Sequence, residues 1–164
     1  MKYYLKQKFL SWFDTYNVYD ESDNIAYTIK GELSWGHKLK IYDKTGNEVG
    51  TLKEKLLVLM PKYVIYNNVG QEIGLIEKRF SLFKPKYFIT PNEWTVTGDF
   101  FNFNYETFDK NNNLVMSTSK KIFHLTDNYE INVFDDSNSL MSIMIVLAID
   151  IDKERQNESN SNDN

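Results

Sequence analysis

The stretch Ser139-Leu-Met-Ser-Ile-Met-Ile-Val-Leu-Ala-Ile149 decides the fold of this chain. It is apolar on every face of any helix that it could form, and such a helix must be buried on all sides. It is too short to cross a bilayer, which needs ~20 apolar residues. The rest of the protein must therefore surround it. The run ends at Asp150-Ile-Asp152, which we interpret as the point where the helix returns to water.

A repeat organises the chain before this helix. Its anchor residues, five tyrosines and one leucine, recur 18 to 24 residues apart, each in a β-rich run. The anchors are Tyr16, Leu39, Tyr63, Tyr87, Tyr105 and Tyr129. A polar turn cluster such as 43–47 follows most anchors and precedes another β-rich run, a pattern typical of a hairpin. Six hairpins predict about twelve strands.

The long helix decides how these strands are arranged. Repeats of this period are typical of solenoids, propellers and barrels. A solenoid has no central hole and the channel of a propeller is normally wet, whereas a closed barrel of twelve strands is wide enough to need a plug. We therefore predict a mainly β fold, a closed twelve-stranded antiparallel barrel of six hairpin repeats. It forms one domain over residues 1–152, with the buried helix at about 139–152; some classifications would group such a fold as α+β.

Composition narrows the class of protein. The chain has 164 residues, no cysteine and a net charge of −4, and its amino terminus lacks the apolar stretch of a signal peptide. We expect a cytoplasmic protein without disulfides, and the acidic balance argues against nucleic acid as a partner. Residues 153–164 are polar with almost nothing to bury, so we predict a disordered tail.

Several separated segments together resemble bacterial members of the LURP-one-related family. These segments are Tyr3-Tyr-Leu-Lys-Gln-Lys-Phe9, Lys62-Tyr-Val-Ile-Tyr66, Phe83-Lys-Pro-Lys-Tyr87, Trp94-Thr-Val-Thr-Gly98-Asp and Ile-Val-Leu-Ala-Ile149-Asp. The resemblance covers roughly residues 1–152. It implies the tubby carboxy-terminal fold, a twelve-stranded barrel around a buried helix, and kinship with phospholipid scramblases. It implies no established activity.

Basic residues suggest one candidate site. Tubby proteins bind phosphoinositide headgroups through basic residues on the barrel exterior, so the resemblance directs attention to lysines and arginines here. One stands eight positions before the anchor in four repeats, at Lys8, Lys55, Arg79 and Lys121, and Lys53 shares a strand face with Lys55. These five residues are the candidate site for an anionic lipid headgroup. The alternative is that they only keep the exterior soluble.

Acidic residues before the helix suggest a second candidate site. Scramblases carry an acidic segment there that is thought to bind calcium, and Asp127, Asp135 and Asp136 are similar to it. Calcium takes six to eight oxygen ligands. The strand expected between these residues would separate its ends by ~20 Å, so one compact site could use only one end. The alternative, which the residue types favour, is a turn and a helix cap.

The sequence does not predict an enzyme. His37 and His124 are far apart, and no phosphate loop, nucleophile elbow or zinc-ligand spacing is present. We expect a structural role for both histidines and core positions for Trp12, Trp35 and Trp94. A helix inside the barrel should leave little room for a small-molecule cavity.

Two classes of function remain open. The first is a non-enzymatic binding module that attaches peripherally to anionic lipid or to a protein partner. The second is a regulator that responds to a small molecule or to calcium, whose helix could be displaced from the barrel. No transmembrane span and no other cofactor are expected, and lipid scrambling is not expected because nothing spans a membrane.

Overall fold

Twelve antiparallel strands form the wall of the barrel. The computed structural model describes residues 1–6, 15–81, 84–123 and 126–161. The strands are β1 (Lys2–Lys6), β2 (Thr15–Asp20), β3 (Ile25–Glu32), β4 (Lys38–Asp43), β5 (Glu48–Glu54), β6 (Lys62–Asn67), β7 (Glu72–Ser81), β8 (Lys84–Thr90), β9 (Trp94–Asp99), β10 (Asn104–Phe108), β11 (Leu114–Phe123) and β12 (Thr126–Val133). Their order is β1-β12-β11-β10-β9-β8-β7-β6-β5-β4-β3-β2, and the sheet closes between β2 and β1. The predicted fold class is confirmed.

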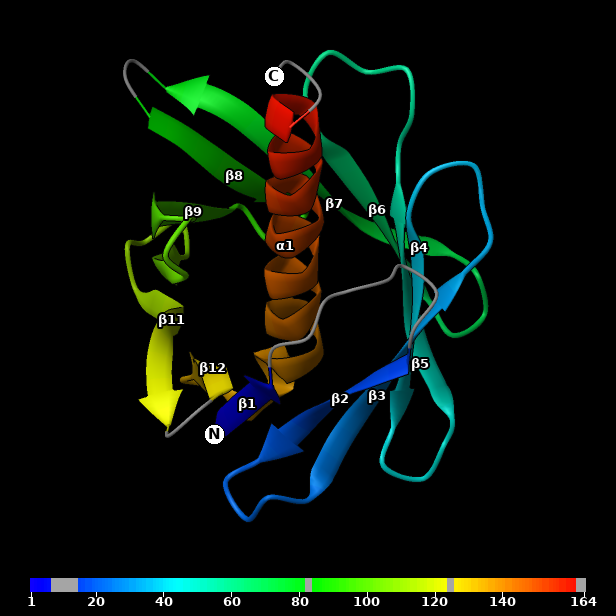
Figure 1. The fold of residues 1–164 in the computed structure, drawn as a ribbon, viewed down its shortest axis with the longest axis vertical. Coiled ribbons are helices and arrows are strands. Elements are labelled where there is room, and N and C mark those ends of the chain that lie inside the picture. Colours follow the sequence, from blue (N-terminus) through cyan, green and yellow to red (C-terminus); the bar gives the residue numbers. More distant parts are fainter. Residues whose placement is uncertain (7–14, 82–83, 124–125, 162–164) are drawn as a thin grey trace.

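Helix α1 (Ser139–Ser161) runs through the barrel (Figure 1). Every residue from Ile143 to Ile149 is at most 1% exposed. The strands cover the helix on all sides, which is the environment that its uniformly apolar surface requires.

The anchor residues of the repeat point into the barrel. Each of them lies in an even-numbered strand. Five of them, Leu39, Tyr63, Tyr87, Tyr105 and Tyr129, are at most 2% exposed, and Tyr16 packs against the same core. Because side chains alternate between the two faces of a strand, fixing one inward anchor per repeat fixes the inward face of each even strand.

Four hairpin turns use the same local device. In each turn an Asp or Asn oxygen accepts hydrogen bonds from the backbone N–H groups two and four residues later. These residues are Asp20, Asp43, Asn67 and Asp109. Such Asx turns favour tight reversals. Strand β12 leads into the helix instead of a hairpin, and its partner is β1, with Tyr3 opposite Ile131. The amino-terminal strand therefore completes the sixth pair.

The helix continues beyond its predicted end. It extends to Ser161, so the prediction of a disordered tail is wrong for residues 153–161, and residues 162–164 lie outside the described part. Lys, Glu, Arg and Gln in this segment are good helix formers. Arg155 also pairs with Glu54 of β5 at 2.9 Å, and the Lys153 ammonium donates to the Phe101 carbonyl at 2.7 Å. These contacts attach the extra turns to the wall.

The two ends of the barrel contain different connections and different halves of the helix. Because the strands alternate in direction, the described connections after odd-numbered strands, residues 33–37, 55–61 and 100–103, share one end with the carboxyl-terminal half of the helix. We name this the helix-exit end; Figure 1 shows the connection after β5 beside the end of the helix. The connections after even-numbered strands lie at the helix-entry end.

Candidate functional site

The second half of helix α1 carries a carboxylate into the barrel interior. Asp152 is 1% exposed. Its Oδ2 accepts hydrogen bonds from the Lys78 ammonium at 2.5 Å, the Tyr87 hydroxyl at 2.5 Å and the Gln156 amide at 2.9 Å. The wall strands β7 and β8 thus supply the partners that a buried charge needs. The interpretation that Asp150 and Asp152 mark a return to water is wrong, because both are buried.

Glu54 forms a second polar contact between wall and helix. This buried carboxylate lies 2.6 Å from His37 Nδ1, accepts from the His37 backbone N–H at 3.1 Å and pairs with Arg155 at 2.9 Å. The hydrogen bond from the His37 ring holds the pKa of Glu54 below its ordinary value. Its charge is therefore retained at neutral pH. His37 acts here as a structural partner, and His124 lies outside the described residues.

Asp150 is buried in a different electrostatic environment. Burial, together with the nearby Glu154, raises the pKa of its carboxyl to about 7, against a smaller lowering by Lys153. A carboxyl with such a pKa changes its charge near neutral pH. The helix therefore contains one buried aspartate, Asp152, that is paired with a lysine, and a second, Asp150, whose charge is disfavoured.

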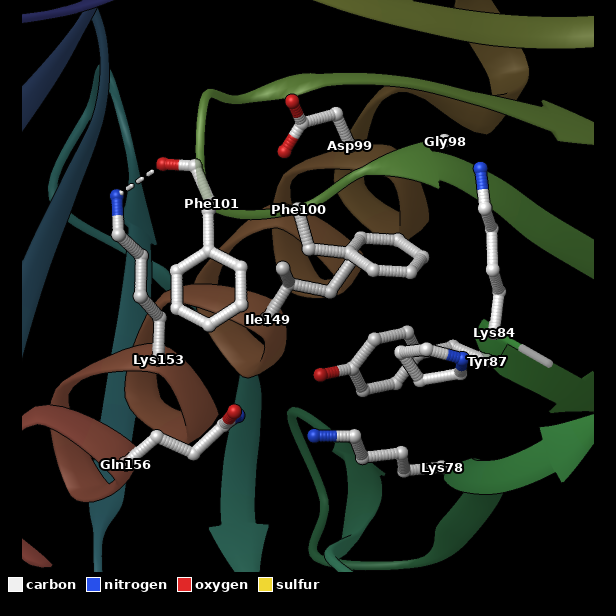
Figure 2. Close-up of a pocket in the computed structure, with 11 residues that line it drawn as sticks. Lys78, Lys84, Tyr87, Gly98, Asp99, Phe100, Phe101, Ile149, Lys153 and Gln156 are labelled. Atoms are coloured by element: carbon white, nitrogen blue, oxygen red, sulfur yellow. Dashed lines mark hydrogen bonds between the residues drawn. The ribbon is translucent and has the colours of Figure 1, made fainter. Parts of the chain in front are cut away.

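A pocket opens beside the helix at the helix-exit end (Figure 2). Its volume is about 300 Å³, and strands β7, β8 and β9, the connection that follows β9, and helix α1 enclose it. Cations and apolar side chains share its lining, among them Lys78, Lys84, Lys153, Tyr87, Phe100 and Ile149. The expectation that the helix leaves little room for a small-molecule cavity is wrong. The helix fills the centre of the barrel but does not seal this side of its mouth.

The predicted headgroup residues are only partly available. Arg79 lies 2.6 Å from Glu77, with its guanidinium 4.8 Å from the centre of the Phe88 ring. Lys121 lies 3.9 Å from Glu130. Each of these two cations therefore faces a carboxylate on the outer wall already.

The remaining candidates do not complete a single site. Lys53 and Lys55 are exposed and close together at the end of β5, and within the described part of the chain neither forms an ion pair. In the closed strand order β11 is third and β5 is ninth, so Lys121 lies on the opposite wall. Lys8 lies outside the described residues. The structure brings Lys53 and Lys55 together, leaves Arg79 two strands away on β7 and places Lys121 on the opposite wall.

The predicted calcium residues have local roles where they are described. Asp135 caps the short 3-10 helix Asp136–Asn138, and its carboxylate accepts from the Ser137 N–H at 3.0 Å and hydroxyl at 2.7 Å. Asp136 lies 3.4 Å from the amino-terminal ammonium. Asp127 is at the far end of β12, and its side chain lies outside the described residues. The capping alternative is confirmed for Asp135. Across the described ranges, no group of three or more metal-ligating side chains is present.

Sequence reasoning missed the inward neighbours of the predicted cations. Glu54 stands next to Lys55, and Lys78 stands next to Arg79. The alternation of strand side chains was a usable signal, because Glu54 follows buried Leu52 by two residues and shares its face. The headgroup prediction followed the repeated basic position, which is occupied by the outward residue of each pair, Lys55 or Arg79.

The tryptophans divide between core and surface. Trp94 is 7% exposed, as predicted, but Trp35 is 90% exposed and its predicted core position is wrong. Trp35 lies in the connection between β3 and β4 instead of a strand. It shares a depression of about 360 Å³ on the outer face with Lys53, Lys55 and Leu56. Trp12 lies outside the described residues.

A closed barrel threaded by its own carboxyl-terminal helix, with a lysine-containing pocket where that helix leaves, defines the class of this protein. The sequence model of the LURP-one-related family matches residues 1–150, and the chain belongs to this family. An Arabidopsis thaliana protein with an X-ray structure is similar in fold, with a TM-score of 0.63 and 15% identity over 92% of this chain and 91% of that one. The comparison with curated proteins gave no match.

Within the described segments, no helix combines the length and the apolar character needed to span a membrane.

Proposed function

We propose that this protein is a non-enzymatic binding module that attaches peripherally to anionic lipid surfaces through the helix-exit end of its barrel. One observation carries the proposal: a group of exposed large apolar side chains lies beside two lysines at that end. The resemblance to tubby proteins supports it at the level of the fold. Of the cations that the sequence suggested, this surface includes Lys53 and Lys55 and leaves out Arg79 and Lys121.

The apolar side chains come from two connections. We name Leu33, Trp35, Leu56, Leu57 and Leu59 the apolar rim. Trp35 and Leu33 are 90% and 86% exposed, and Leu57 and Leu59 are fully exposed. A Cβ atom on Gly36 would lie 2.9 Å from Leu56, so the connections 33–37 and 55–61 are in contact. Large exposed apolar patches mark protein or membrane interaction sites.

The two lysines beside the apolar rim favour an anionic lipid surface as its partner. Lys53 and Lys55 share the outer depression with Trp35. Lysines can extend their aliphatic stems along apolar surface while their ammonium groups reach lipid phosphates. Tryptophan is enriched at the boundary between lipid and water. Leu57 and Leu59 would enter the acyl boundary while the lysines remain at headgroup level.

The helix-entry end has the opposite character. Its connections, residues 21–24, 44–47, 68–71, 91–93, 109–113 and 135–138, carry six acidic residues and two lysines. The described connections 33–37, 55–61 and 100–103 carry no acidic residue. An anionic membrane would repel the first end and accept the second. The charge difference therefore orients the barrel with its helix-exit end toward the lipid.

Vesicle co-sedimentation tests this proposal. The full chain is mixed with phosphatidylcholine vesicles and with vesicles containing phosphatidylglycerol, at low and high salt. We expect binding to the anionic vesicles that high salt weakens. Leu57→Asp with Leu59→Asp should abolish binding, and Lys53→Glu with Lys55→Glu should weaken it strongly.

A matched control is available at the other end of the barrel. Val69→Asp with Ile73→Asp also places two charges on exposed apolar positions, and it should leave binding unchanged. If this control variant lost as much vesicle binding as Leu57→Asp with Leu59→Asp, the proposed orientation would be contradicted. No sedimentation under any condition would overturn lipid attachment and leave a protein partner as the occupant of the apolar rim.

A further inference from the structure

The pocket beside helix α1 is a separate feature from the apolar rim. It lies inside the wall, between strands β7 to β9 and the helix, whereas the rim lies on the connections 33–37 and 55–61. Figure 2 shows side chains from these elements converging around Phe100 and Ile149. Its volume of about 300 Å³ is that of a small ligand pocket. A diacyl lipid would not fit.

Three lysines reach the pocket from three different elements. Lys78 comes from β7, Lys84 from β8 and Lys153 from the helix. Two carboxylates offset them: Asp99, which lines the pocket, and Asp152, which lies behind Lys78. Asp99 is also engaged by the Asn102 side-chain amide at 2.7 Å. The lysines therefore outnumber the carboxylates by one, which matches an anionic ligand.

The cations are held in place before any ligand arrives. Lys78 is 8% exposed, and among the described residues its ammonium donates a single hydrogen bond, to Asp152. An ammonium has three donors, so this geometry fixes its position and leaves donors for a ligand. The Lys153 ammonium donates to the Phe101 carbonyl at 2.7 Å and lies 4.4 Å from the centre of the Phe103 ring. Rigid donors lose little entropy on binding.

Apolar groups form the rest of the pocket. Phe100 packs edge-on against Tyr87 with ring centres 5.0 Å apart, and Ile149 of the helix closes the inner side. Pro85 and Phe101 extend this surface toward the opening. A ligand bound here would place an apolar body against these side chains and its charge among the lysines.

We infer that this pocket binds a small molecule with one oxyanion, a carboxylate or a phosphate, on an aliphatic or aromatic body. The site goes beyond lipid attachment and does not depend on it. Lys78 and Lys153 provide the fixed donors, and Lys84 at the opening provides the third charge. Because the helix forms one side of the pocket, the ligand contacts helix and wall together.

Titration of the full chain with defined probes, followed by two-dimensional amide NMR, tests the inference. The probes are octanoate, octyl phosphate and the neutral octanol, all below their micelle concentrations. We expect both anions to give saturable shifts at residues 98–101 and 153–156, and octanol to give none. Lys84→Glu should weaken octanoate binding about tenfold or more, as expected for the loss of a charge-assisted hydrogen bond.

Lys86→Glu is the matched control, because Lys86 lies on the same strand and does not line the pocket. Its spectrum and its octanoate affinity should match wild type. Equal binding of octanol and octanoate would overturn the inference, as would equal effects of the two lysine variants. Failure of both anions to give saturable shifts, or shifts confined to other parts of the barrel, would also overturn it.

Discussion

The ammonium of Lys78 on the barrel wall lies 2.5 Å from the carboxylate of Asp152 on the central helix, and both side chains are buried. The two residues are 74 positions apart in the chain. Close packing of the core already disfavours sliding of the helix, and the buried ion pair adds a further requirement because its two charges must meet. This pair therefore contributes to fixing the axial position of the helix in the barrel.

Removing one partner of this pair should be costly. Asp152→Asn leaves the Lys78 ammonium buried without a counter-charge, and we expect a loss of about 3 to 5 kcal/mol in the free energy of unfolding. The double variant Lys78→Met with Asp152→Asn should recover part of that loss, because no unpaired charge remains. Urea unfolding of wild type, Asp152→Asn, Lys78→Met and the double variant measures these values. Additive losses would show that the two residues do not interact as the structure indicates.

Burial of the helix centre has an independent test. Val146 is 1% exposed, so Val146→Asp would place a charge without a partner in the core. We expect a loss of several kcal/mol, comparable to the stability of a whole domain. Val69→Asp, at a position that is 71% exposed, is the control and should change stability by less than about 0.5 kcal/mol. Thermal unfolding that is the same for both variants would contradict the plugged barrel.

Asp150 should make stability depend on pH. Its ordinary pKa of 3.8 is raised to about 7 in the folded protein, chiefly by burial. Below pH 3.8 the Asp150 carboxyl is largely protonated in both the folded and the unfolded chain, and its full contribution to the free energy of unfolding is present. As pH rises toward 7 the unfolded chain releases this proton first, so the contribution is lost.

Asp150→Asn lacks this titration and isolates its effect. We expect the variant to gain about 2 to 3 kcal/mol relative to wild type between pH 5 and pH 7.5. Urea unfolding of both proteins at several pH values measures the difference between their free energies of unfolding. The other carboxylates are common to both proteins, so their titration cancels in this difference. A difference between the two proteins that is constant over this range would show that Asp150 is not buried as described.

Much of the fold could be predicted because it follows from periodic patterns. The inward anchors, such as Tyr63 and Tyr87, and the apolar run to Ile149 required twelve strands around a helix. The extension of the helix to Ser161 could not be predicted from local composition, since tertiary contacts such as Arg155 with Glu54 stabilise it. The pocket was missed for the same reason. Its lysines are separated in the chain, and only the closure of the sheet and the course of the helix bring them together.

Hydrogen exchange on membranes tests the central claim most directly, because it shows which end of the barrel touches the lipid. Amide exchange is compared for the free protein and for the protein on phosphatidylglycerol-containing vesicles. We predict slower exchange on the vesicles at residues 33–37 and 55–61, where Trp35, Leu57 and Leu59 are exposed. Residues 44–47 and 68–71 at the helix-entry end should be unchanged. Protection at the helix-entry end, or no protection anywhere, would contradict the account.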